Sequence, residues 1–376
     1  MSRNLLIILV MGLLLVFLLP TPRKPPAPDS FEAVCHGPAL TTVEARNDAM
    51  EKGYAIHPVH QCIEKASYEA IEAQRIAWEQ AQEERVAQER SEVAASGGNA
   101  FVQARLGFRT QVSDPAPPSN PLPQPPPHWF VRSDYVNPQN YTLVGYISPD
   151  PADGQRHPAI LWLTGGDTNT LGDFWSAGPD ANDQSVHAFR EAGVVMAFVA
   201  LRGGNGHRSQ REFFLGEVDD VLAAARQLAQ IRYVDPQRIY LGGHSTGGTL
   251  ALLTAAMGRN FRGVFAFGPV ASVDTYPGDI LPLDFAALDP LELKLRSPLH
   301  WLAGIGQPTW IIEGANPPGN VADLDALCAA TRNPQVRCLR VPGVDHFGVL
   351  RPATRAIAAQ MAAGGEISLT TDQLRR

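Results

Sequence analysis

The chain has 376 residues, 44% of them hydrophobic and 18% charged, which is the composition of a globular protein and excludes wholesale disorder. With 31 Lys and Arg against 38 Asp and Glu, its net charge of −7 argues against a nucleic-acid-binding protein, because phosphate recognition needs a basic surface. The four cysteines form no C-x-x-C pair, so we expect no metal site, and we expect no cofactor.

The first twenty residues are typical of a membrane or export segment. Residues 5–19 carry no polar side chain, although they fall short of the roughly 20 residues of a membrane span. Arg3 precedes this run, and the sequence after it lacks the small residues of a cleavage site. We therefore favour an uncleaved signal-anchor over residues 1–20, with a cleaved signal peptide as the alternative. The catalytic domain is then expected on the exported, periplasmic or extracytoplasmic side, and a secreted protein is the second choice.

A helical hairpin is predicted over residues 41–96. Thr41 and Glu44 form the capping box of a first helix, which stops near Gly53. A second helix, from about Val59 to Ala95, is rich in Ala, Glu, Gln and Arg, and its sparse apolar stripe buries little surface. We interpret the hairpin as a stalk that acts as a spacer, with an element for oligomerisation or docking as the alternative.

Proline-rich segments flank this hairpin. Residues 21–40 are expected to be an extended linker, and residues 97–127, with eight prolines at positions 115–127, a second and semi-rigid linker. The catalytic domain is therefore predicted over residues 128–363, followed by a C-terminal tail at 364–376.

Strands alternate with helices through this domain, which predicts an α/β fold with a mostly parallel sheet flanked by helices. The predicted strands are Phe130–Val136, Tyr141–Ile147, Ala159–Leu163, Val194–Ala200, Ile239–Leu241, Gly263–Phe267, Thr309–Glu313 and Val336–Val341. The predicted helices are Asp183–Ala192, Glu217–Gln230, Thr249–Met257, Val321–Thr331 and Ala353–Ala363. Leu281–Pro298 shows few regular signals, and we interpret it as a lid or specificity segment.

The most informative motif is Gly243-His244-Ser245-Thr246-Gly247, which fits the pattern G-x-S-x-G. It follows an apolar strand and precedes a helix, as a nucleophile elbow does. Such a turn lifts the serine hydroxyl above the sheet and places it at the positive end of a helix. Ser245 is therefore the predicted nucleophile, and a structural turn without catalysis is the alternative.

A nucleophilic serine needs a base and two N–H donors for the oxyanion. His346 follows the last predicted strand and precedes the closing helix, the usual place for the base. One donor is predicted to be the N–H of Thr246. The other is predicted in the glycine-containing loop after the strand Ala159–Leu163, from Gly166 or Asp167.

The acid of the catalytic triad should follow the penultimate strand, but Pro317 occupies the position where an aspartate is expected. Glu313 at the end of that strand is our choice, and Asp323 is the alternative acid. Asn316 is a further candidate that can orient an imidazole but stabilises its cation less well than a carboxylate. Asp274 is a more remote candidate.

Together these motifs resemble the prolyl oligopeptidase-like branch of the α/β-hydrolase superfamily, over about Trp129 to Ala363. The resemblance is carried by the runs Pro158–Gly166 (PAILWLTGG), Leu201–Gly204 (LRGG), Val234–Gly248 (VDPQRIYLGGHSTGG) and Gly343–Phe347 (GVDHF). It implies an α/β-hydrolase fold in which Ser245 is the nucleophile and His346 the base. The family's usual acid position is not acidic here. The helical N-terminal region is also too short for the β-propeller that gates the large oligopeptidases, so size-gated hydrolysis of oligopeptides is not implied.

We therefore predict a serine hydrolase that cleaves a small ester or a short peptide through an acyl-enzyme intermediate. A peptidase is favoured, a carboxylesterase or other acyl hydrolase is the first alternative, and a non-catalytic binding or scaffold module on the same fold is the second. Arg202 is a candidate anchor for a charged substrate terminus, and a structural arginine is the alternative. Phe174 and Trp175 are candidate residues of an apolar pocket.

The four cysteines suggest two disulfides. Cys35 and Cys62 could join the base of the helical hairpin, and Cys328 and Cys338 could join the helix and strand near the C-terminus. Two such pairs would suit an oxidising compartment, and four buried free cysteines are the alternative.

Overall fold

The structure of the protein is a computed structural model. It describes residues 54–55, 63–64, 73, 76, 80, 99–112, 121–278 and 280–375. The chain divides into two units, residues 1–87 and 88–376. No helix among the described residues is long and apolar enough to cross a membrane. The predicted signal-anchor at 1–20 and linker at 21–40 lie outside the described residues.

In the first unit, β1 (Tyr54–Ala55) and β2 (Ile63–Glu64) form an antiparallel pair. The predicted helix from Val59 is therefore wrong at its start, where a β-branched isoleucine favours an extended strand. Further along, Ala73, Ile76 and Gln80 are helical and exposed.

The second unit is built on an eight-stranded sheet with the order β12-β11-β10-β9-β7-β8-β6-β3. The strands are β3 (Val131–Arg132), β6 (Gly145–Ile147), β7 (His157–Leu163), β8 (Val195–Val199), β9 (Val234–His244), β10 (Gly263–Phe267), β11 (Thr309–Gly314) and β12 (Val336–Val341). From β12 to β8 the neighbours are parallel, whereas β6 and β3 continue the sheet antiparallel. A separate antiparallel pair joins β4 (Tyr135–Val136) to β5 (Thr142–Leu143). The mostly parallel sheet confirms the predicted α/β class.

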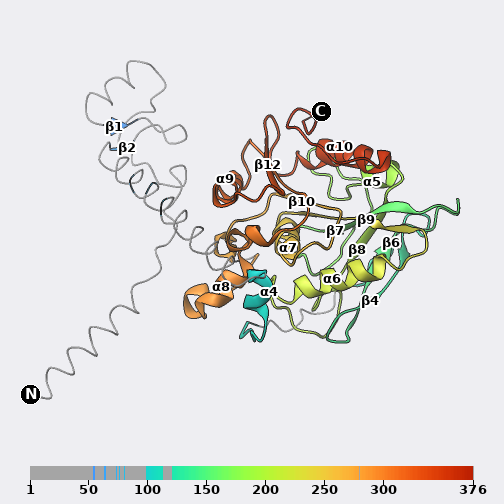
Figure 1. Ribbon diagram of the computed structural model, residues 1–376, viewed down its shortest axis with the longest axis horizontal. Helices are drawn as coiled ribbons and strands as arrows, with labels where there is room; N and C mark the ends of the chain where they lie inside the picture. The colour runs from blue at the N-terminus through green and yellow to red at the C-terminus, as the bar shows by residue number, and fades with distance from the viewer. Residues whose placement is uncertain are drawn as a thin grey trace, which may run out of the picture. The chain divides into compact units, whose positions relative to one another are not determined.

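Helices cover both faces of this sheet. They are α5 (Ala188–Glu191), α6 (Glu217–Leu228), α7 (Thr246–Ala255), α8 (Pro290–Arg296), α9 (Val321–Ala330) and α10 (Leu350–Ala363), with short 3₁₀ turns at Val273–Thr275, Phe285–Ala287, Pro298–His300 and Leu302–Gly304. On one face α5 lies beside α10, and on the other lie α6 and α7 (Figure 1). The predicted irregular segment Leu281–Pro298 contains α8, whose start is fixed by the N-cap Asp289 and by Pro290 in its first turn.

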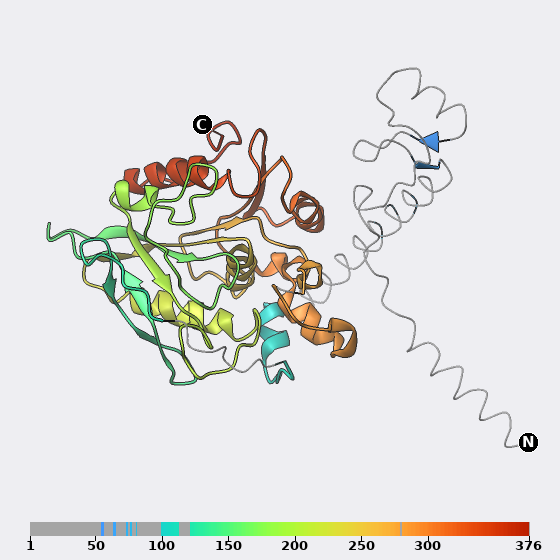
Figure 2. The ribbon, with the colours of Figure 1, turned by 180° about the vertical axis from the view of Figure 1, so that it is seen from behind.

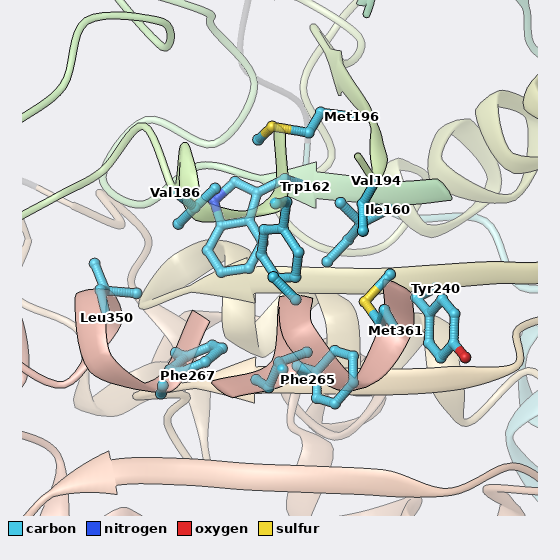
Figure 3. Packing of buried hydrophobic residues seen from close by; sticks show 14 of the residues in the cluster. Ile160, Trp162, Val186, Val194, Met196, Tyr240, Phe265, Phe267, Leu350 and Met361 are labelled. Carbon is cyan, nitrogen blue, oxygen red and sulfur yellow. The ribbon is translucent and has the colours of Figure 1, made fainter. Parts of the chain in front are cut away.

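The core lies between the sheet and α10, around Trp162 of β7 (Figure 3). The indole of Trp162 lies 6.0 Å from the ring of Phe189 and 5.8 Å from that of Phe267. Leu350 and Met361 of α10 close the cluster from the helical side (Figure 3). Because the central strands are covered on both faces, their sequences are almost continuously apolar.

Two predicted boundaries of the catalytic domain are wrong. Within the predicted linker 97–127, residues 99–112 hold α4 (Ala100–Arg105), and the side chain of Phe101 is 1% exposed and packs against Trp301 of the second unit. The predicted tail 364–376 is packed as well, since Leu374 is buried in the core cluster. Both segments carry apolar side chains, and these are removed from water when the segments pack on the rest of the unit.

A disulfide joins Cys328 of α9 to Cys338 of β12, with their Cα atoms 6.1 Å apart. This pair was one of the two suggested by the spacing of the cysteines. The other suggested pair, Cys35 and Cys62, lies outside the described residues.

Candidate active site

Ser245 occupies the sharp turn between β9 and α7. Its φ of 55° and ψ of −116° are strained for a residue with a side chain, a strain of about 1–3 kcal/mol that is typical of functional sites. A Cβ atom on Gly243 would collide with the backbone of Gly247, so the turn requires a glycine there. The Ser245 N–H donates to the carbonyl of Phe267 on the neighbouring β10 at 2.8 Å. The elbow therefore holds Ser245 at the carboxyl edge of the sheet and at the N-terminus of α7.

His346 lies in the loop between β12 and α10, where the backbone N–H donates to the carbonyl of Pro318 at 3.1 Å. Its Nδ1 is 2.9 Å from Oε2 of Glu313, a fully buried side chain near the end of β11. The Glu313 carboxylate also accepts from the backbone N–H groups of Gly314 at 2.7 Å and Asn320 at 3.0 Å. Since a carboxylate only accepts, Nδ1 is the donor and Nε2 is left as the basic nitrogen.

The predicted nucleophile, base and acid surround one bend at the end of β10. Gly268 has a φ of 54°, and a Cβ atom there would collide with the imidazole of His346 and approach Oε2 of Glu313 at 2.9 Å. The preceding residue, Phe267, is the one whose carbonyl holds the N–H of Ser245. The structure thus brings together three residues that are far apart in the sequence.

His244, which precedes Ser245 in the chain, packs against His346. Its ring centroid lies 4.5 Å from that of His346, and its Nε2 is 3.1 Å from the His346 carbonyl. Its Nδ1 is 3.2 Å from the amide nitrogen of Gln184, which can only donate. Burial, reinforced by the neighbouring His346, lowers the pKa of His244 to about 3. His244 is therefore neutral near pH 7, with its proton on Nε2.

The predicted oxyanion donors lie on two adjoining segments. The hydroxyl of Thr246, in the first turn of α7, donates to the carbonyl of Gly166 at 2.9 Å. This bond ties the loop after β7 to the start of α7, where the N–H groups of the first turn have no helical acceptor. Both loop candidates, Gly166 and Asp167, therefore lie beside the start of α7 and line the same pocket as Thr246.

The other candidate acids lie elsewhere. Asp323 is in the first turn of α9, and its Oδ1 accepts from the backbone N–H of Ala271 at 3.0 Å. Asn316 donates its backbone N–H to Val344, and Asp274 is exposed in a 3₁₀ turn. The carboxylate that is hydrogen-bonded to the imidazole of His346 is that of Glu313.

A pocket of about 250 Å³ opens beside Thr246 and Gly166. It is lined by Gly166, Asp167, Thr168, Asn169, Arg211, Phe213, Phe214, Thr246, Ile280, Leu281 and Pro282. Its charged wall is an ion pair of 3.0 Å between Arg211 and Asp167. Three further polar side chains line it, and the apolar part of the wall comes from Phe213, Phe214, Ile280, Leu281 and Pro282. The predicted pocket residues do not line it. Phe174 is 2% exposed in the core, and Trp175 packs against it.

Arg202 is a structural residue and not a substrate anchor. Its guanidinium is 2% exposed and binds Asp220 at 2.9 Å and Glu212 at 2.7 Å. The fully buried Glu217 lies beside this cluster, and burial raises its pKa. The prediction failed because the sequence does not show that these acids lie around the arginine.

The residues that sequence reasoning missed are Phe213 and Phe214 of the pocket. The sequence contains this aromatic pair shortly before α6 but no motif that assigns it to a site. Among the described residues, no group of three or more His, Cys, Asp or Glu side chains is placed to hold a metal ion.

Comparison with known proteins gives one family match. The family model described as the prolyl oligopeptidase family matches residues 180–286, a segment that contains Ser245. No curated protein matches the sequence. The family match confirms the resemblance predicted from the motifs.

Solved structures share the fold. Puromycin hydrolase is similar with a TM-score of 0.51 and 21% identity, covering 64% of this chain and 40% of that chain. A puromycin-hydrolyzing peptidase of Mycobacterium tuberculosis gives 0.50 and 18%, covering 63% and 40%. The 2,6-dihydroxy-pseudo-oxynicotine hydrolase gives 0.50 and 17%, covering 64% and 70%. At such identities the likeness shows an α/β-hydrolase-like fold, and this chain spans less than half the length of the two puromycin-hydrolysing proteins.

Proposed function

We propose that this chain, a serine hydrolase similar to the prolyl oligopeptidase family, cleaves peptide or ester bonds through an acyl-enzyme intermediate. The observation that carries the proposal is the contact of 2.9 Å between His346 and Glu313, beside the strained elbow of Ser245. The non-catalytic alternative depended on a missing acid. The contact between Glu313 and His346 argues against this alternative, because it supplies a candidate acid.

In the first half of the reaction, the hydroxyl oxygen of Ser245 attacks the substrate carbonyl carbon. Nε2 of His346 accepts the hydroxyl proton, and the Glu313 carboxylate stabilises the imidazolium that forms. The carbonyl oxygen becomes an oxyanion, which accepts hydrogen bonds from the N–H of Thr246 and from that of Gly166 or Asp167. The tetrahedral intermediate then expels the amine or alcohol, which takes the proton from His346. An ester of Ser245 remains.

In the second half, water replaces the leaving group and loses its proton to Nε2 of His346 as it attacks the ester. The same two N–H groups stabilise the second oxyanion. When this intermediate breaks down, Ser245 regains its proton from His346 and the carboxylic acid leaves.

The pocket beside Thr246 is proposed to receive the acyl part of the substrate. Its volume of about 250 Å³ is below the roughly 300–1,000 Å³ of pockets for drug-sized ligands, which suits a single side chain. Phe213, Phe214 and Ile280 give it an apolar surface, and the charge of Arg211 is already paired with Asp167. An uncharged aromatic or large aliphatic side chain is therefore favoured.

A peptidase is favoured because the family model that matches is that of a peptidase family. The test is a panel of aminoacyl and dipeptidyl p-nitroanilides beside p-nitrophenyl esters of the same acyl groups. Hydrolysis of the anilides supports a peptidase, and hydrolysis of the esters alone supports a carboxylesterase. If the wild type cleaves none of them faster than its Ser245→Ala variant, the proposal is wrong.

Export and membrane anchoring are proposed from the apolar run at residues 5–19. The disulfide Cys328–Cys338 supports an oxidising compartment, because cytosolic disulfides are rare. Fractionation of cells that express the full chain tests this. Recovery of the protein in the soluble cytosolic fraction with both thiols free would contradict it.

A further inference from the structure

The loop before α6 forms one wall of the pocket in a strained conformation. Phe213 and Phe214 both line the pocket, and their φ values are 47° and 70°. Bulky side chains rarely adopt positive φ, and such a conformation persists only where the surrounding structure imposes it. The ring of Phe214 also stacks on Tyr276, with centroids 5.9 Å apart and planes 10° apart. The wall therefore needs supports outside the pocket.

Arginines from three segments supply these supports. On the C-terminal side of the two phenylalanines, Nη1 of Arg105 in α4 donates to the carbonyl of Leu215 at 2.8 Å. On the N-terminal side, Nε of Arg296 in α8 donates to the carbonyl of Glu212 at 3.1 Å, and Arg202 binds the Glu212 carboxylate. The carbonyls on both sides of the strained pair are thus held by guanidinium groups.

The segment that carries Arg105 is itself firmly attached. Arg105 also pairs with Asp219 of α6 at 2.8 Å, and its side chain is 11% exposed. At the start of α4, Asn99 donates to the carbonyl of Ala256 at 2.7 Å, and Phe101 packs 5.0 Å from the ring of Trp301. Figures 1 and 2 both show α4 beside α8.

The far end of the segment is attached to α8. The Thr110 hydroxyl lies 2.9 Å from Oε2 of Glu292, and it accepts from Nη2 of Arg296 at 2.8 Å. The backbone N–H of Gln111 donates to Glu292 at 2.7 Å. The segment 99–112 thus binds α8 and the start of α6, the two elements next to the aromatic wall.

We propose that the segment 99–112 is a specificity element of the active site, in which Arg105 is a positioning residue for the Phe213–Phe214 wall. Through the Leu215 carbonyl and Asp219, Arg105 keeps the strained wall in the form that receives a bulky acyl group. The inference rests on the proposed function, because it assigns the pocket to the acyl part of the substrate. It goes beyond that function by giving a substrate-selecting role to residues N-terminal to the hydrolase region.

The test compares two p-nitrophenyl esters with one leaving group, the 3-phenylpropanoate and the acetate. The selectivity is the ratio of their kcat/KM values. Arg105→Ala is expected to lower this ratio about tenfold or more, chiefly through a higher KM for the aromatic ester. Arg105→Lys keeps a cationic donor and should restore part of the selectivity. Arg109→Ala is the matched control, since Arg109 lies on the same segment and bonds the carbonyl of its neighbour Phe108.

A double-mutant cycle separates positioning from general destabilisation. If Arg105 acts through the wall, Arg105→Ala should change the ratio less than twofold in a Phe213→Ala background. The milder Arg105→Gln is compared in the same way if Arg105→Ala does not fold. An unchanged ratio in the Arg105 variants, or the same change in the Phe213→Ala background, overturns the inference while the hydrolase remains. A wild type that hydrolyses neither these esters nor any anilide of the panel above overturns the proposed function as well.

Discussion

Replacing Glu313 by glutamine tests how the base is held. Both carboxylate oxygens are used, since Oε1 accepts from the N–H of Gly314, and Oε2 accepts from Asn320 and from Nδ1 of His346. An amide offers one acceptor and one NH₂ donor, so in either orientation its NH₂ meets a backbone N–H. When the NH₂ faces His346, Nδ1 must accept and the ring proton moves to Nε2. The imidazole then cannot take the proton of Ser245.

The expected loss in kcat/KM for Glu313→Gln is about 10³- to 10⁴-fold, since replacing a triad acid by its amide can lower kcat about 10⁴-fold. That loss corresponds to about 4–5 kcal/mol of transition-state stabilisation. The backbone N–H that loses its acceptor costs a further 1–3 kcal/mol or so of the free energy of unfolding. Steady-state hydrolysis of a p-nitrophenyl ester and urea unfolding measure the two effects separately.

Asp323→Asn is the matched control. Its amide oxygen can still accept from the N–H of Ala271, so we expect less than a tenfold loss of activity. A folded Glu313→Gln variant within tenfold of the wild type would refute the reasoning. So would a larger loss in Asp323→Asn than in Glu313→Gln.

Three further substitutions test the surroundings of the base and the oxyanion site. Gly268→Ala is expected to lower kcat at least about 100-fold, because the added Cβ displaces the imidazole of His346. The circular dichroism spectrum should stay native. A rate within threefold of wild type would contradict this placement of His346. Thr246→Val removes the hydrogen bond to Gly166, which is worth about 1 kcal/mol, so the acylation rate measured by stopped flow should fall about fivefold. An unchanged rate would show that this bond does not hold the loop. His244→Gln should flatten the pH dependence of stability. Burial holds the pKa of His244 at about 3, below its value of 6.5 in the unfolded chain. The contribution of this pKa difference to the free energy of unfolding is therefore complete above pH 6.5 and is lost as the pH falls toward 3. Between pH 7 and pH 4.5, urea unfolding should show that the free energy of unfolding falls by about 2–3 kcal/mol more in the wild type than in the variant. Equal losses would mean that His244 can be protonated in the folded state.

The sequence was sufficient for the parts of the site that local patterns define. The elbow around Ser245 and the loop with His346 each follow a strand and precede a helix, and those contexts can be read from a few adjacent residues. Glu313 was chosen for its place at the end of a strand. Its contact with the imidazole depends on the pairing of β11 with β10 and β12, which a single sequence does not specify.

The pocket and the outer boundaries could not be predicted because they depend on long-range packing. Phe213 and Phe214 become pocket residues only through their conformation and through the supports that hold it. The sequence around Arg202 does not show that Asp220 lies beside it. Residues 99–112 follow a spacer-like sequence and precede a proline run, which made them resemble a linker. Their few apolar and charged side chains find partners on α6 and α8 only in the folded chain.

The central claim is that Ser245 is a nucleophile activated within a triad. The most direct measurement is intact-mass and peptide-mass analysis after reaction of the folded protein with a fluorophosphonate probe, compared with Ser245→Ala and His346→Ala. We predict a single adduct on the peptide that contains Ser245 in the wild type, no adduct in Ser245→Ala, and labelling slowed by at least about 10³-fold in His346→Ala. An unlabelled wild type, or an adduct that persists in Ser245→Ala, would contradict the account.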